Sequence, residues 1–165
     1  MRESKIASAN AANKTAGWQP IKKTAVLLFS NGLIKYGFGI GSTGITSGEV
    51  CFNTSITGYQ EIMSDPSYAH QIVNFTFPHI GNVGANNEDN ETANPDQEIH
   101  ISGIITHAYI EKPSNYRSKS TLSEWMRDRK ITGISGVDTR YITKLIRDKG
   151  MMSCLIEHRH DGIFN

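Results

Sequence analysis

The apolar residues of this chain fall in short β-prone runs, each closed by a turn signal, and no other feature constrains the fold as much. Thr24–Phe29 is followed by Asn31 and Gly32, which both tolerate the positive φ of a type I′ hairpin turn. A returning strand is therefore expected through Leu33–Tyr36. None of the runs approaches the roughly 20 residues needed to cross a bilayer, so the sequence predicts no membrane span.

Further strands are predicted wherever β-branched and aromatic residues cluster between turn residues. They are Glu49–Phe52, Gln71–Thr76, Ile99–Ile101, Gly103–Ile110 and Met151–Ile156. Residues 78–98 are rich in Asn, Gly, Asp and Glu, a composition that predicts a long surface loop. The chain is thus expected to contain more strand than helix.

Helices are predicted at three places, and all of them are short. Residues 57–68 allow at most one or two turns before Pro66 stops the helix. Thr121 and Glu124 form a capping-box pattern, in which each side chain satisfies a free backbone donor of the other residue. Asp138 can cap a helix that buries Ile142, Leu145 and Ile146 on one face and ends at Gly150.

The 165 residues correspond in length to one domain, and the net charge of +1 gives no basis for binding nucleic acid.

Cys51 and Cys154 both lie in apolar stretches, which predicts buried thiols in a reducing compartment and hence a cytoplasmic protein. The six histidines are scattered, without the spacing of a metal site, so no metal is expected.

One glycine-rich segment, Gly39–Gly44, formally matches the G-x-G-x-x-G fingerprint of dinucleotide-binding domains. That fingerprint requires a helix N-terminus directly after the glycines, whereas Ile45–Gly48 has the composition of a strand. A free-standing small-molecule or nucleotide-binding domain that uses this segment is the alternative function. A turn without a ligand is the simpler interpretation.

Two further positions are candidates for binding. The sequence Asp65-Pro66-Ser67-Tyr68 holds the Ser67 hydroxyl in a rigid turn, and no neighbouring base could activate it as a nucleophile, so binding is favoured over covalent chemistry. His79 lies in a glycine-containing loop, and a hydrogen bond from its ring to the loop backbone is more plausible than a catalytic role.

Five strings stand in a fixed order along the chain. They are Gly48–Thr54, Thr57–Ile62, Asp65–Tyr68, Pro78–Gly84 and Gly136–Arg140. Together they closely resemble the N-terminal domain of the small subunit of glutamine-dependent carbamoyl-phosphate synthase, and the likeness covers roughly residues 24–157. The resemblance implies an α/β fold of the three-layer β/β/α swivelling type.

The resemblance also implies a function. The family's small subunit hydrolyses L-glutamine and passes ammonia to a large subunit, which uses bicarbonate, two ATP and Mg to make carbamoyl phosphate for arginine and pyrimidine synthesis. A second, C-terminal amidotransferase domain carries the family's catalytic Cys, His and Glu. This chain is therefore expected to hold no catalytic residue and no cofactor, to support glutamine hydrolysis, and to dock against the large subunit.

The one ligand contact implied by the resemblance is Ser67, which matches the serine that the family uses at its glutamine site. The implied organisation is a flexible N-terminal tail over residues 1–20, the family domain over residues 21–157, and the start of a linker to an absent amidotransferase domain over residues 158–165.

Overall fold

The computed structural model describes residues 21–86, 88–89 and 101–164, so the predicted tail over residues 1–20 lies outside the described residues. The strands are β1 (Ala25–Phe29), β2 (Ile34–Gly41), β3 (Gly44–Asn53), β4 (Gln71–Phe75), β5 (Gly103–Ile105), β6 (Thr132–Ser135) and β7 (Met152–His158). The helices are α1 (Tyr59–Ser64), α2 (Leu122–Asp128) and α3 (Thr139–Lys149), with a 3₁₀ turn at Pro66–Tyr68.

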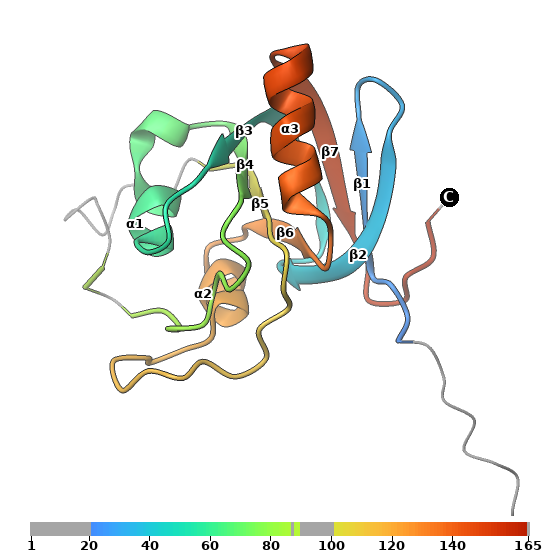
Figure 1. Ribbon diagram of the computed structural model, residues 1–165. Helices are drawn as coiled ribbons and strands as arrows, with labels where there is room; N and C mark the ends of the chain where they lie inside the picture. The colour runs from blue at the N-terminus through green and yellow to red at the C-terminus, as the bar shows by residue number, and fades with distance from the viewer. Residues whose placement is uncertain (1–20, 87, 90–100, 165) are drawn as a thin grey trace, which may run out of the picture.

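The seven strands close into a barrel in the order β1-β2-β6-β5-β4-β3-β7 (Figure 1). The pairs β3–β4, β4–β5 and β5–β6 are parallel. The remaining pairs are antiparallel, and β7 closes the barrel by pairing with both β1 and β3. Parallel neighbours need crossover connections, and α1 supplies the crossover from β3 to β4.

Two apolar cores lie on the two faces of the parallel strands. Side chains alternate along a strand, so Ile72 of β4 faces one core and its neighbour Val73 faces the other. The first core lies between the parallel strands and β1 and β7, and α3 buries Ile142 and Ile146 in it. The second core lies between the parallel strands and the helices α1 and α2. The order of these layers is β/β/α.

Two helix starts follow the predicted chemistry. The Thr121 hydroxyl accepts a hydrogen bond from the Glu124 backbone N–H (3.1 Å), and the Glu124 carboxylate accepts one from the Thr121 N–H (2.8 Å), which completes the capping box of α2. The Asp138 carboxylate accepts the Tyr141 N–H at 2.9 Å and caps α3, which ends at Gly150. Complete burial of a side chain such as Ile142 stabilises the fold by about 1.5–3 kcal/mol.

The first hairpin forms where it was predicted, but the prediction of a type I′ turn is wrong. Gly32 has a φ of 85°, while Asn31 is not among the described residues with positive φ, so the turn is not type I′. The hydrogen bonds from Gly32 N to Phe29 O and from Phe29 N to Leu33 O instead define a three-residue loop over residues 30–32. Only one left-handed residue is needed there, and glycine provides it.

Several predicted strand lengths also need correction. The strand predicted at Gly103–Ile110 ends at Ile105, because the chain then leaves the sheet and Ala108 N donates to Pro78 O at 3.1 Å. The strand at Glu49–Phe52 is longer and begins at Gly44. Strand β6 was not predicted. Of the strand predicted at Ile99–Ile101, only Ile101 is described, and it lies outside any strand.

The predicted α/β class, rich in strands with a few short helices, is confirmed. Among the described residues no helix is both long enough and apolar enough to cross a membrane.

Candidate functional site

Ser67 lies in the crossover between β3 and β4, where two local signals fix its backbone. Pro66 begins the 3₁₀ turn with its φ already restricted to the helical range. The Asp65 carboxylate caps this turn by accepting a hydrogen bond from the Ser67 N–H at 2.8 Å. The turn closes with Ala69 N donating to Pro66 O at 3.0 Å. The local backbone conformation at Ser67 is therefore set by residues that are adjacent in sequence.

The Ser67 side chain is exposed, and within the described part of the chain its hydroxyl has no hydrogen-bond partner. The next residue, Tyr68, is half-buried and packs against the second core. Its hydroxyl accepts a hydrogen bond from the side-chain amide of Asn53, at the end of β3, with a donor–acceptor distance of 3.1 Å. This arrangement presents a free hydroxyl on a fixed backbone, which suits ligand binding.

Helix α1 joins this crossover to the loop that follows β4. The buried Tyr59 hydroxyl donates to the carbonyl of Gly84. The Gln60 side-chain amide pairs with the backbone of Asn86 in both directions, donating to Asn86 O and accepting from Asn86 N. The crossover and the loop are thus held as one unit.

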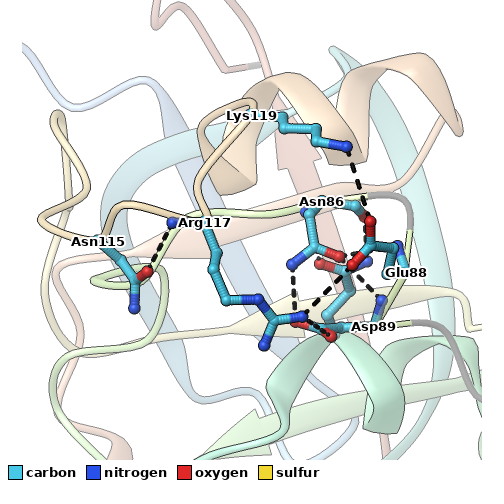
Figure 2. Close-up of polar contacts among 7 residues, drawn as sticks. Asn86, Glu88, Asp89, Asn115, Arg117 and Lys119 are labelled. Carbon is cyan, nitrogen blue, oxygen red and sulfur yellow. Dashed lines mark hydrogen bonds and ion pairs between the residues drawn. The ribbon is translucent and has the colours of Figure 1, made fainter.

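The same loop is held on its other side by a polar cluster, Asn86, Glu88, Asp89, Asn115, Arg117 and Lys119, shown in Figure 2. The Asn86 side-chain oxygen accepts from the backbone N–H groups of Glu88 (2.8 Å) and Asp89 (2.9 Å). Arg117 Nη2 lies 2.8 Å from Asp89 Oδ1 and 3.7 Å from Glu88 Oε2, and Lys119 Nζ lies 3.9 Å from Glu88 Oε1.

The charges within this cluster compensate one another. The hydrogen bond from the Asn86 amide, assisted by Arg117, holds the pKa of Asp89 below its usual range. The hydrogen bond to Asp89 raises the pKa of Arg117 in turn. Since these groups already satisfy each other, the cluster has a structural role in fixing the loop.

Within the described part of the loop, His79 does not make the hydrogen bond to the backbone that the sequence suggested. Its ring is exposed and lies edge-on to Phe77, with the ring centroids 5.8 Å apart. Ring packing explains its position without a catalytic role.

The cysteines are free thiols in settings that disfavour the reactive thiolate. Burial raises the pKa of Cys51 to about 11 and that of Cys154 to about 12. Cys154 is buried as predicted, but Cys51 is only partly buried, at the edge of the packing against the second core. Neither thiol is suited to nucleophilic attack. Among the described residues no three His, Cys, Asp or Glu side chains are grouped to hold a metal ion.

The glycine-rich segment does not have the geometry of a dinucleotide site. Gly39 and Gly41 belong to β2 and Gly44 begins β3, so a strand follows the glycines and no helix N-terminus is available for a phosphate. A Cβ on Gly39 would overlap the His158 ring, and one on Gly41 would overlap the carbonyl of Ile131. These glycines allow close packing.

An open groove of about 470 Å³ lies beside this segment, lined by residues 43–45 and 157–161. His158, one of the lining residues, is buried, and its Nδ1 lies 2.9 Å from the carbonyl oxygen of Ser42. Because a carbonyl oxygen can only accept, Nδ1 is the protonated nitrogen. Burial lowers the pKa of His158 below its ordinary value. The His160 ring packs against it edge to face at 5.6 Å.

Comparison with known proteins assigns the family. The sequence model of the carbamoyl-phosphate synthase small chain, CPSase domain, matches residues 27–156. The chain belongs to this family. The small chain of Mesorhizobium japonicum carbamoyl phosphate synthase is 50% identical over 151 residues, which cover 92% of this chain and 38% of that protein. The matched region contains all five ordered strings, so the resemblance seen in the sequence is confirmed.

Two other small chains of the family give similar values. That of Bradyrhizobium diazoefficiens is 50% identical over 90% of this chain and 37% of its own length. That of Rhizobium meliloti is 49% identical over 92% of this chain and 38% of its own length. The chain therefore spans less than two fifths of the length of these relatives.

Sequence reasoning predicted a binding role for Ser67 and assigned no role to Asn53 or Tyr68. The Asn53 side-chain oxygen accepts a hydrogen bond from the Ser55 N–H at 2.8 Å. An asparagine that bonds to the backbone two residues further along is a common turn motif, so the sequence does offer a local signal at Asn53. The distance from Asn53 to Tyr68 depends on the crossover and could not be read from the sequence.

Proposed function

We propose that this chain acts as the N-terminal domain of the glutaminase subunit of carbamoyl-phosphate synthase. The family match over residues 27–156 supports this proposal most directly. In this role the domain supports L-glutamine hydrolysis in the cytoplasm and docks against the large subunit. The large subunit binds ATP and Mg and makes carbamoyl phosphate from bicarbonate and ammonia.

In this proposal Ser67 contributes a hydrogen bond to glutamine. The exposed hydroxyl on a capped turn supports the assignment, because a binding group held in place loses little conformational entropy when the ligand arrives. A hydroxyl can donate and accept, so it suits either the carboxylate or the ammonium group of an amino acid.

The catalytic Cys, His and Glu are assigned to a separate amidotransferase domain of the parent protein, so this domain alone is inactive. The raised pKa values of Cys51 and Cys154 support that division of labour, since neither thiol is activated.

The test is Ser67→Ala in the complete two-subunit enzyme. Loss of one hydrogen bond worth about 0.5–1.5 kcal/mol should raise the KM for glutamine about twofold to tenfold. Synthesis from added ammonia should be unchanged, since it does not use the glutamine site. An equal loss with both nitrogen sources would contradict the proposal. Ser153→Ala, at an exposed position in β7, is the matched control.

A further inference from the structure

The turn that carries Ser67 is held from both sides. On the N-terminal side, the Asp65 carboxylate binds the Ser67 N–H at 2.8 Å. On the C-terminal side, the Tyr68 hydroxyl binds the side chain of Asn53 at 3.1 Å, a contact between residues 15 positions apart. The first contact fixes the shape of the turn, and the second fixes where the turn lies relative to the barrel.

Asn53 is a firm anchor for this second contact. Its side-chain oxygen accepts the Ser55 N–H at 2.8 Å, which leaves its Nδ2 to donate to Tyr68. Its backbone carbonyl accepts from both the N–H (3.0 Å) and the hydroxyl (3.1 Å) of Thr76, just beyond β4. Asn53 thereby links the end of β3 to the end of β4, and Tyr68 is tied to that link.

The Tyr68 ring adds packing to this hydrogen bond. It lies against the second core, which includes Tyr59 and Met63 of α1. A ring held both by packing against a core and by a hydrogen bond at its hydroxyl has little freedom to rotate. Since Ser67 is covalently next to Tyr68, displacement of the ring would displace the Ser67 hydroxyl.

We propose that Asn53 and Tyr68 are positioning residues for Ser67, setting the location of its hydroxyl for the amino-acid substrate. The inference rests on the proposed role of Ser67 in binding glutamine. A binding group must be held within about 0.5 Å of its productive position, and local capping alone does not fix a turn against the rest of the domain.

The test uses glutamine-dependent kinetics of the complete two-subunit enzyme. Tyr68→Phe removes only the hydroxyl and should raise the KM for glutamine about twofold to tenfold, with kcat and ammonia-dependent synthesis unchanged. Asn53→Asp should retain near-normal KM, because its carboxylate can accept from both Ser55 N–H and the Tyr68 hydroxyl. Tyr116→Phe, at a fully exposed tyrosine, is the matched control.

The double variant separates positioning from general destabilisation. If Tyr68 acts through Ser67, Tyr68→Phe should add no further change once Ser67→Ala is present. Two outcomes would overturn the positioning role while leaving the Ser67 contact in place. The first is a double variant whose increase in KM is the product of the two single increases. The second is a normal KM for Tyr68→Phe when the KM of Ser67→Ala is raised. A normal KM for Ser67→Ala would overturn both.

Discussion

Gly39 and the imidazole of His158 occupy adjoining space, so that a Cβ built on Gly39 would overlap the ring. The two residues lie on β2 and β7, which are not neighbours in the sheet but are separated by β1. Gly39→Ala should therefore overpack the site and lower the free energy of unfolding by about 1–3 kcal/mol, measured by urea denaturation.

A double-variant cycle assigns this cost to the ring. In the background of His158→Ala the space at position 39 is open, so Gly39→Ala should cost much less there than in the native sequence. Equal costs in the two backgrounds would show that the backbone, and not the contact with His158, sets the requirement for glycine.

Protonation of the His158 imidazole should make the stability of the fold depend on pH. Burial lowers its pKa below the ordinary value of 6.5, aided by the positive charges of His160 and Arg127 and opposed by the bond to Ser42. At pH values between the pKa of His158 in the folded protein and about 6.5, the unfolded chain therefore binds more protons than the folded one. The free energy of unfolding should accordingly fall as the pH drops through this interval and stay level just above it.

His158→Asn tests the assignment, because it keeps an N–H donor but cannot titrate. The variant should be less stable near pH 7, yet its free energy of unfolding should change less between pH 7 and pH 5.5. His160→Asn, at an exposed position, should retain most of the native slope. A slope that survives in His158→Asn would assign the dependence to other groups.

Sequence reasoning succeeded where structure is set by neighbouring residues. Thr121 and Glu124 cap α2 through backbone groups three residues apart, and Asp138 does the same for α3. The turn at Asp65–Tyr68 was recognised for the same reason. Signals of this kind need no knowledge of the rest of the chain.

It failed where distant residues decide the structure. Strand β6 has no recognisable apolar run because Gly133 must leave room for Ile104, Ile40 and Met126, whose side chains would lie about 2.9 Å from a Cβ there. After Ile105, Thr106 N still donates to Ile134 O at 2.8 Å, but Ala108 N donates to Pro78 O, so the β-like residues that follow turn away from the sheet. The bond between Asn53 and Tyr68 likewise forms only once the crossover is in place.

The N-cap of α3 provides a test of local capping. Asp138→Ala removes the acceptor for the Tyr141 N–H and should lower the free energy of unfolding by about 1 kcal/mol, measured in urea. Asp138→Asn should cost much less, because asparagine caps equally well. Similar losses in both variants would point to the charge of Asp138, rather than its hydrogen bond, as the source of stability.

The two thiols should be protected in the folded protein. Since burial raises the pKa of Cys51 to about 11 and of Cys154 to about 12, very little thiolate exists at pH 8. Alkylation by iodoacetamide, followed by mass spectrometry, should be slow for both and slower for the more deeply buried Cys154. In denaturant both should react at the rate of a free thiol, which provides the control. Rapid labelling of the partly buried Cys51 in the folded state would show that its thiol is activated, and would reopen the question of a nucleophile within this domain.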